Sequence, residues 1–313
     1  MNVFLTTFEA VAALLGIGFV GFWIIRQKIL PETMLGVLSA LALDIALPSL
    51  VFATIITTFS PSRDPHWWQL PLWWLAFTGL AAGMTAVARY LSPLSVRREF
   101  SAALFYQNGI FFPLAIITGM FGAESVYLTH LFLFTLFYAA FFFTTMPLFF
   151  GKMREIRWRK IVNPVLAATL LAIALRLTGA HDYVPDFLVD SVSLLGAMTV
   201  PLLMLILGGT MYMDLQARDR FHWVQMATFA ATKNLLFPAL FLLVIVVLRP
   251  PFEIALILLL ESAVPPVTAV PLMVSRMGGN RAVANQFMIA SFLASLATIP
   301  LMVYLFSQYY PLP

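Results

Sequence analysis

Apolar residues fall into ten long runs, and short segments with charged or turn-forming residues separate each run from the next. About 20 consecutive apolar residues are enough for a helix to cross the hydrocarbon core of a bilayer. The pattern therefore predicts an all-α integral membrane protein with ten transmembrane helices. We expect these helices at roughly residues 3–25, 34–58, 69–90, 98–121, 124–149, 162–179, 186–212, 222–248, 252–276 and 282–307.

The ninth run contains residues that an uninterrupted helix does not tolerate. Pro265 and Pro266 stand side by side near its middle, and Pro271 follows them. Each proline removes a backbone donor and clashes with the carbonyl four residues earlier, at about 3 kcal/mol in a helix interior. Hydrocarbon offers the freed carbonyls no partner, so a break here must be buried in protein or line a polar cavity. Glu261 and Ser262 directly precede the prolines, and a carboxylate at membrane depth indicates a functional site.

The fourth run has a similar interruption. Gln107, Asn108, Gly109 and Pro113 lie inside an otherwise apolar span, and a glycine and a proline near its middle predict a second break. We expect the two breaks to meet near the membrane midplane, where each satisfies the other's freed backbone groups. The half-helix N-termini beside them carry about half an elementary positive charge each, which favours an anion.

Composition excludes several classes of function. The chain is 61% hydrophobic and 10% charged, whereas soluble domains contain about 25% charged residues. It has no cysteine, which excludes disulfides, thiolate metal sites and a cysteine nucleophile, and its four histidines occur singly. We therefore expect no metal and no cofactor. The net charge of +4 reflects membrane topology and does not indicate nucleic-acid binding.

The positive charges orient the predicted helices. Fourteen of the 18 Lys and Arg residues lie in the loops after the first, third, fifth, seventh and ninth helices. The positive-inside rule puts these loops in the cytoplasm. We therefore expect a multi-pass protein of the inner or plasma membrane with both termini extracytoplasmic. Residues 3–25 have no basic segment before them and no A-x-A-like cleavage site after them, which predicts a retained span and not a signal peptide.

The basic loop at 152–160 divides the helices into two groups of five, residues 1–151 and 161–313. Because five is an odd number, the second group enters the membrane with the opposite polarity. Shifting the chain against itself by 153 residues superimposes three pairs of prolines: Pro48 on Pro201, Pro113 on Pro266 and Pro147 on Pro300. This common register favours an inverted-topology repeat, an architecture that many transporters share.

Five segments of the chain resemble spans of one known family. They are ALPSLVF (46–52), KIVNPVLAATLLAIAL (160–175), LLGAMTVPLLMLILGGTM (194–211), ESAVPPVTAVPLMVSRMGGN (261–280) and ANQFMIASFLASLATIPL (284–301). They are similar to the auxin efflux carrier family, which includes plant auxin exporters and bacterial malate-type permeases, and the chain looks like a bacterial member. One difference lies in the fourth span, which often reads Asn-x-Gly-x-x-Gly-x-Pro in the family. Here Gly109 follows Asn108 directly and the proline is Pro113.

The resemblance implies two inverted five-helix repeats, related in architecture to bile acid:sodium symporters, with helices 4 and 9 broken where they cross. Spans 1, 2, 6 and 7 would form a scaffold that often dimerises. Spans 3–5 and 8–10 would form a transport domain that moves against it like an elevator. Family members carry organic anions, mostly carboxylates. We therefore expect a homodimer joined through the scaffold, with a small organic anion as its substrate.

Six residues around the two breaks are candidate substrate contacts: Asn108, Gly109, Pro113, Ser262, Pro265 and Pro266. Pro48, Pro201 and Pro271 are candidate helix breaks or hinges. Prolines also kink packed membrane helices without any part in binding, and this interpretation stays open.

Asp44, Glu261 and Lys233 are charged residues inside predicted spans and are candidates for proton coupling. A charged Glu261 at mid-membrane costs about 2.5–3.5 kcal/mol on insertion scales, so we consider it either a neutral proton carrier or an acceptor for freed backbone amides. Lys233 would form a structural pair with Glu261 or bind a carboxylate substrate. Asp44 lies four residues before Pro48, whose ring frees the Asp44 carbonyl. It would hold a proton or a cation, or be a protonated group bonded within the scaffold.

Together these features predict a secondary active transporter, a permease or efflux carrier, that moves a small organic anion by alternating access, driven by protons or by the membrane potential. A sodium-coupled symporter of the bile-acid type and a non-transporting ligand sensor are alternatives. Sodium sites need clustered oxygen ligands, which the two broken spans supply sparsely. We expect no enzyme, because no His-Glu-x-x-His or paired-Asp group lies within the spans.

Overall fold

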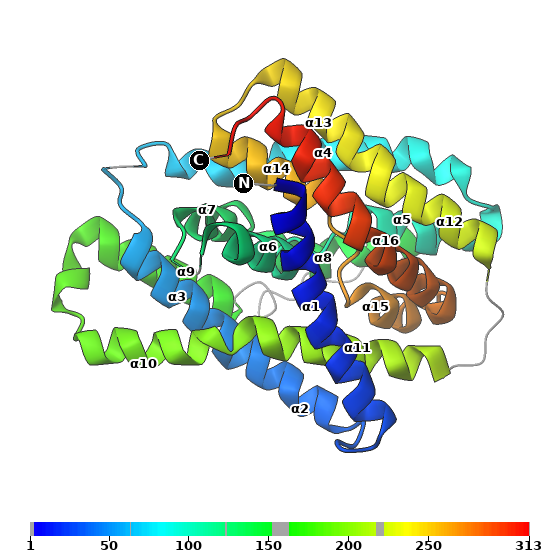
Figure 1. Cartoon of the computed structure of the whole chain (residues 1–313), viewed down its shortest axis with the longest axis horizontal. Coiled ribbons are helices and arrows are strands. Elements are labelled where there is room, and N and C mark those ends of the chain that lie inside the picture. The colour runs from blue at the N-terminus through cyan, green and yellow to red at the C-terminus, as the bar shows by residue number, and fades with distance from the viewer. Residues whose placement is uncertain (1–2, 63, 123, 152–162, 217–221, 313) are drawn as a thin grey trace.

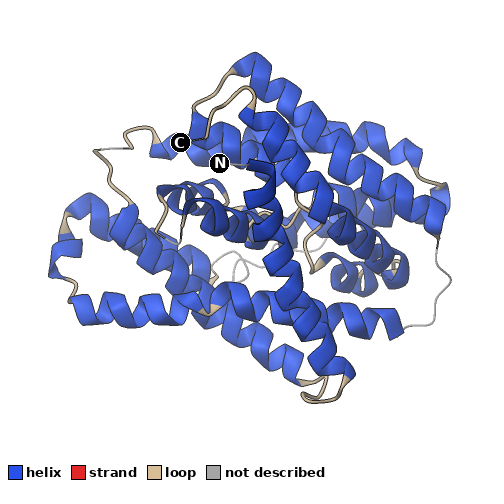
Figure 2. Ribbon diagram, viewed as in Figure 1, coloured by secondary structure: helices blue, strands red, loops and turns tan. Residues whose placement is uncertain are grey.

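The computed structural model describes residues 3–62, 64–122, 124–151, 163–216 and 222–312. These residues form helices and loops without strands (Figure 2). The α-helices in chain order are α1 (Val3–Arg26), α2 (Met34–Ala40), α3 (Leu47–Thr58), α4 (Leu70–Ala88), α5 (Arg97–Phe105), α6 (Phe111–Phe121), α7 (Val126–Phe134), α8 (Tyr138–Thr145), α9 (Pro164–Thr178), α10 (Asp186–Ala197), α11 (Thr199–Gln216), α12 (Trp223–Ala231), α13 (Phe237–Leu248), α14 (Phe252–Ala263), α15 (Val270–Arg276) and α16 (Arg281–Ser307).

Two π-helical turns, η1 (Leu41–Ala46) and η8 (Thr232–Leu236), join α2 to α3 and α12 to α13 without a gap. The remaining short elements are 3₁₀ turns: η2 (Trp67–Gln69), η3 (Arg89–Leu91), η4 (Leu94–Val96), η5 (Met146–Phe150) and η7 (Ala180–Tyr183).

Among the residues that the structure describes, seven helical stretches are long and apolar enough to cross a membrane: Val3–Arg26, Met34–Thr58, Trp67–Leu91, Val126–Phe150, Asp186–Met213, Trp223–Leu248 and Arg281–Ser307. The predicted all-α membrane protein is thus confirmed. The other three predicted ranges contain shorter helices. The ranges 98–121 and 252–276 are each divided in two, and 162–179 contains α9, which has 15 residues.

Two sets of helices are visible in Figure 1. The helices α2, α3, α9 and α10 lie together at the lower left, and α4, α12 and α13 lie at the upper right. On the first side α3 packs against both α9 and α10, and on the second α16 packs against α12, α14 and α15. The helix α1 contacts both sets, because it packs along α11 and also against α6 and α16.

Glycines permit the contact between α1 and α11. A Cβ atom at Gly208 would overlap the backbone carbonyl of Gly18, and one at Gly21 would overlap the carbonyl of Leu205. Small residues of this kind allow membrane helices to approach backbone to backbone and gain dispersion contacts.

The interior of the second set is densely apolar. Every residue of α14 from Ile254 to Ala263 is buried. The rings of Phe100, Phe229 and Phe287 stack or meet edge to face and thereby join α5, α12 and α16. The helix α14 itself packs against α13 and α16.

Candidate functional site

Two spans are interrupted in the middle of the molecule. The helix α5 ends at Phe105 and α6 begins at Phe111, while α14 ends at Ala263 and α15 begins at Val270. We call the connecting residues 106–110 and 264–269 the paired breaks, because they lie against each other.

Backbone hydrogen bonds join the paired breaks. The N–H of Asn108 donates to the carbonyl of Pro265 at 2.7 Å, and the N–H of Val267 donates to the carbonyl of Tyr106 at 2.9 Å. Gln107 and Pro266 thereby face each other in an isolated antiparallel bridge. The donors belong to the neighbours of Gln107 and Pro266, so the missing N–H of Pro266 leaves no bond unmade. Each break thus supplies partners for the other at a depth where water is scarce.

Glu261 lies directly behind the paired breaks, in the last turn of α14, with no exposed surface. Its Oε2 accepts a hydrogen bond from the Gln107 side-chain amide at 3.2 Å. The carboxylate also packs on the Cα of Gly109, where an added Cβ would lie 2.9 Å from Oε1 and 3.0 Å from the carboxyl carbon. Tyr138 on α8 donates its hydroxyl hydrogen to the carbonyl of Gln107. Glu261 therefore accepts its hydrogen bond from the side chain of Gln107. The alternative prediction was that it would accept from freed backbone amides.

Lys233 occupies the π-helical turn η8 and is 1% exposed. Its ammonium lies 5.2 Å from the ring centre of Phe237. The turn η8 packs against α14, yet no ion pair of 4.0 Å or less joins Lys233 to Glu261 among the residues that the structure describes. The neighbouring Asn234 donates to the carbonyl of Ser291 at 3.1 Å and accepts from the Ser291 hydroxyl at 2.7 Å.

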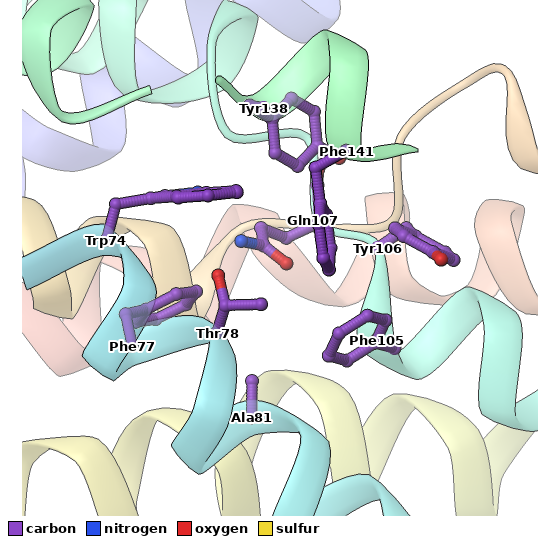
Figure 3. Close-up of a pocket in the computed structure, with 9 residues that line it drawn as sticks. All are labelled: Trp74, Phe77, Thr78, Ala81, Phe105, Tyr106, Gln107, Tyr138 and Phe141. Carbon is purple, nitrogen blue, oxygen red and sulfur yellow. The ribbon is translucent and has the colours of Figure 1, made fainter. Parts of the chain in front are cut away.

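A small cavity lies on the other side of Gln107. It has a volume of about 10 Å³, close to that of one water molecule, and aromatic side chains form most of its wall. Figure 3 shows the Gln107 amide between Trp74 and Phe141, with Tyr138 above it and the Thr78 hydroxyl pointing toward it. The indole N–H of Trp74 is buried and has no hydrogen-bond partner among the described residues.

A larger cavity of about 370 Å³ opens on the front of the paired breaks. It is lined by residues from the breaks, η1, α3, α7, α8 and α9: Leu43, Asp44, Leu47, Val51, Asn108, Gly109, Ile110, Phe111, Phe132, Thr135, Leu136, Tyr138, Ala139, Phe142, Phe143, Asn163, Pro164, Val165, Thr169, Val267, Thr268 and Ala269. We call it the front cavity. Asn108 is 1% exposed, and its side-chain Nδ2 has no partner among the described residues.

A third cavity, of about 80 Å³, borders the same breaks toward α2 and α11. Asn108, Phe111 and Thr268 line both this cavity and the front cavity. The breaks are therefore flanked by open space on two sides.

The structure brings only some of the predicted site residues to the front cavity. Asn108, Gly109 and Asp44 line it, and Asp44 is an exposed residue of η1. Pro113, Ser262, Pro265 and Pro266 do not line the described cavity. The Ser262 hydroxyl donates to the Leu259 carbonyl of its own helix at 2.7 Å.

Of the predicted hinge prolines, Pro271 lies in the first turn after a break, where a missing N–H is harmless, whereas Pro48 and Pro201 lie inside the continuous helical stretches Met34–Thr58 and Asp186–Met213. Pro48 is the second residue of α3, Pro201 the third of α11 and Pro271 the second of α15. Pro113 is likewise the third residue of α6, whereas Pro266 lies within a break. The 153-residue shift, which superimposes Pro113 on Pro266, therefore does not superimpose the two breaks: Pro113 lies in the first turn of the helix after the first break, as Pro271 does after the second.

Sequence inspection missed several lining residues. Val267, Thr268 and Ala269 complete the second break, and Thr135 and Asn163 add polar groups from two other helices. The signal for the first three was present, because the chain between the double proline and the helix-starting Pro271 must be non-helical. Asn163 also caps α9, since its Oδ1 accepts from the N–H of Leu166 at 2.8 Å.

The arrangement offers hydrogen-bond donors in an otherwise apolar chamber. The N-terminus of α6 begins at the cavity wall with Phe111 and brings partial positive charge. Asp44 is the one charged residue among the described lining residues. The described part of the chain has no cluster of three or more His, Cys, Asp or Glu that could hold a metal.

The chain also matches a known protein family over nearly its whole length. A sequence model of the family described as "Membrane transport protein" matches residues 6–157 and 147–303. The chain belongs to this family, the auxin efflux carriers. A search of curated proteins found no match. Because members of the auxin efflux carrier family are transporters, the front cavity belongs to a multi-pass membrane transport protein.

Proposed function

We propose that this carrier moves a small organic anion, in the first place a carboxylate, across the membrane by alternating access. The observation that carries the proposal is the position of the front cavity. Residues of two interrupted helices, among them Asn108 and Thr268, line it, as in binding sites built from broken helices in other transporters. Its volume of about 370 Å³ lies within the usual range for ligand pockets.

The lining supports an anion with an apolar body. The unpartnered Nδ2 of Asn108 and the start of α6 offer hydrogen-bond donors and positive potential to a carboxylate. Phe132, Phe142 and Phe143 line the rest of the chamber and would contact the apolar part of the solute. No Lys or Arg is among the described lining residues, so recognition rests on dipoles and hydrogen bonds.

Asp44 supports a link between anion and proton movement. A carboxylate in the same chamber as an anionic solute repels it unless the carboxylate is protonated. Proton uptake by Asp44 would therefore accompany anion binding, and the proton gradient would drive transport. The buried pair of Lys233 and Glu261 is the second candidate for proton coupling, and the membrane potential is the alternative driving force.

The front cavity lies between η1, α3 and α9 on one side and the paired breaks, α7 and α8 on the other, so movement of one side against the other would open it to alternate sides. In this proposal α1–α3 and α9–α11 form the scaffold, which joins two copies in a homodimer. The helices α4–α8 and α12–α16 form the transport domain, and α5–α6 and α14–α15 are the two crossing spans of an inverted repeat. Both termini are extracytoplasmic in this arrangement.

The test is uptake of labelled organic acids by proteoliposomes under an imposed pH gradient or membrane potential. Asn108→Ala should lower uptake about tenfold or more, because a hydrogen bond to a charged group contributes about 1.5–3 kcal/mol. Gln308→Ala, which removes the same amide from an exposed position, is the matched control and should transport normally. Normal uptake by Asn108→Ala would contradict the site assignment.

A second set of uptake measurements distinguishes proton coupling from sodium coupling. Asp44→Asn should remove the response to a pH gradient, since the amide does not take up a proton. Dependence on a sodium gradient instead would favour sodium-coupled symport. Binding of an acid without any flux would favour a ligand sensor over a carrier.

A further inference from the structure

A groove unrelated to the front cavity lies at the end of α4, between its last turns, the start of α5 and η5. Its wider part has a volume of about 360 Å³ and is lined by Arg89, Arg98, Ser101, Leu148 and Phe149. A narrower part of about 140 Å³ shares three of these residues, and its other lining residues are Ala82, Thr85, Ala86 and Phe105. We call the two parts the arginine groove and the apolar slot.

The two arginines of the groove are available to an anion. Arg89 and Arg98 are exposed, and neither has a carboxylate within 4.0 Å among the residues that the structure describes. Arg97, which directly precedes Arg98 in the sequence, already has hydrogen-bond and aromatic partners. Its Nε and Nη2 donate to the carbonyl of Ser92 at 3.3 and 3.2 Å, and its guanidinium lies 5.0 Å from the ring centre of Tyr90.

The acidic residue nearest in sequence does not neutralise this pair. Glu99 is 6% exposed, and its Oε1 accepts a hydrogen bond from the N–H of Asn280 at 2.8 Å. Arg98 is in the first turn of α5, so the positive end of this nine-residue helix adds to the charge of the groove. A phosphate group matches such a site, because guanidinium groups bind phosphate oxygens through paired, charge-assisted hydrogen bonds.

The apolar slot extends from the arginine groove along α4, away from the end of the helix. Ala82 and Ala86 are exposed and small, and the rings of Phe105 and Phe149 form the opposite wall. Thr85 is 4% exposed, and its hydroxyl has no partner among the described residues. It lies one helical turn before Arg89, which puts it one turn deeper in the span Trp67–Leu91.

We propose that the arginine groove and the apolar slot together bind one anionic phospholipid. The phosphate would lie between Arg89 and Arg98, and an acyl chain would lie in the slot over Ala82 and Ala86. The Thr85 hydroxyl would donate to a glycerol ester carbonyl one turn below the phosphate. A free phosphate ion would use only the groove and would leave the slot and the Thr85 hydroxyl without a partner, which favours the lipid. Basic pockets at membrane interfaces are a known means of holding anionic headgroups.

The position of the slot gives the lipid a route to the paired breaks. Phe105 lines the slot and is also the last residue of α5, directly before the first break. It lines the small cavity behind Gln107 as well, as Figure 3 shows. A chain packed against Phe105 would therefore restrain the end of the half-helix that positions Asn108.

Native mass spectrometry of the purified full-length carrier tests the headgroup part. With phosphatidylglycerol the wild type should retain one lipid, and with phosphatidylcholine about tenfold less, since the zwitterionic headgroup offers less net charge to the arginines. The double variant R89Q/R98Q should bind phosphatidylglycerol about tenfold more weakly, whereas Arg26→Gln, an exposed arginine on α1, should bind as the wild type does. Equal binding by the double variant and the wild type would overturn the proposal.

A second variant tests the acyl chain and separates the lipid from a soluble phosphate. Ala86→Phe fills the slot from an exposed position and should weaken phosphatidylglycerol binding, while Ala76→Phe, exposed elsewhere on α4, should not. Glycerol phosphate at the same concentration should not displace the lipid. Full displacement by glycerol phosphate, or unchanged binding in Ala86→Phe, would show a site for soluble anions and overturn the lipid assignment.

Discussion

The carboxylate of Glu261 has three different neighbours in the interior of the molecule. Gln107 donates a hydrogen bond to it, Gly109 leaves space for it, and the turn η8, which packs against α14, contains the buried Lys233. A buried charge of this kind is tolerated only when its surroundings compensate for the lost solvation. The stability of the protein should therefore depend on this residue and its partners as a unit.

Replacing either member of the charged pair should destabilise the fold. Lys233→Met or Glu261→Gln leaves one buried charge without compensation, at about 3–5 kcal/mol. The double variant K233M/E261Q should lose less than either single variant, because no charge remains. Thermal unfolding of the purified carrier measures all three. If Glu261→Gln alone unfolds like the wild type, the carboxyl is neutral in the native state and the pair is not ionic.

Gly109→Ala should also destabilise, because the new methyl group would contact the Glu261 carboxylate. Overpacking of this kind costs about 1–3 kcal/mol. The cost should shrink in a Glu261→Ala background, which removes the atoms that the methyl group meets. Gly83→Ala is the matched control, since its Cβ would meet nothing within 4 Å. Equal losses in both backgrounds would show that space beside Glu261 is not the reason for the glycine.

The unusual polar residues inside the spans indicated where the site lies, but their positions in the sequence did not show which of them face the cavity. Asn108 and Glu261 stand out in the sequence because polar groups are costly inside a span. Their separation into front and back of the breaks depends on the direction of each side chain, which a sequence pattern does not fix in non-helical chain. For the same reason Ser262 was expected at the substrate and instead bonds to its own helix.

At the level of elements, prolines accompany the two π-helical turns. The turn η1 precedes Pro48, and η8 precedes Pro238, each the second residue of the following helix. A π turn widens the helix, so the N–H after it bonds five residues back, as Leu47 does to Ala42. These turns contain Asp44 and Lys233, two of the three charged candidates.

Pro48→Ala should let η1 relax into regular helix. Each residue of a regular helix turns the chain by about 100°, whereas a residue of a π turn turns it by less, so this change would rotate position 44 relative to α3 and away from the front cavity. Because the protein has no cysteine, Asp44→Cys provides a unique thiol for maleimide labelling. Labelling should slow when Pro48→Ala is added, whereas Glu32→Cys, in an exposed loop, should label equally in both backgrounds. Unchanged labelling at position 44 would contradict a role for the proline.

Both helix breaks could be predicted from the sequence, but the alignment of one break with the other could not. The double proline and the Asn-Gly pair marked both breaks, since neither fits a helix at membrane depth. The proline repeat then aligned Pro113 with Pro266, although a proline is equally acceptable in the first turn of a helix. A proline therefore indicates a nearby helix end without showing on which side of it the break lies.

For the whole molecule, transport should stop when the proposed scaffold and the proposed transport domain are tied together. Thr7 on α1 and Met120 on α6 touch across them, with the Thr7 hydroxyl 3.6 Å from the Met120 sulfur. In the variant T7C/M120C, a short thiol cross-linker should reduce uptake to background, and a cleavable linker should restore it on reduction. Each single variant treated with the same reagent is the control. Uptake that survives complete cross-linking would contradict movement between these helices.

Hydropathy alone predicted the membrane class and the limits of most spans, because burial in lipid demands long apolar runs whatever the fold. It did not reveal which helices pack together. That packing depends on details such as the backbone contact between Gly18 and Gly208. The sequence shows that these two residues have no side chain, but not that they meet. The cavities depend on this packing, so the sequence did not predict them either.

The bridge between Gln107 and Pro266 has a consequence for how such a carrier can change its substrate. Both bonds that close it are made by main-chain atoms, so side-chain replacement in the breaks does not remove either one, except where a proline replaces a donor. Positions such as Asn108 and Thr268 are therefore free to vary while the meeting point of the two chains persists. New specificities can arise by mutation at these positions without first dismantling the architecture that holds them.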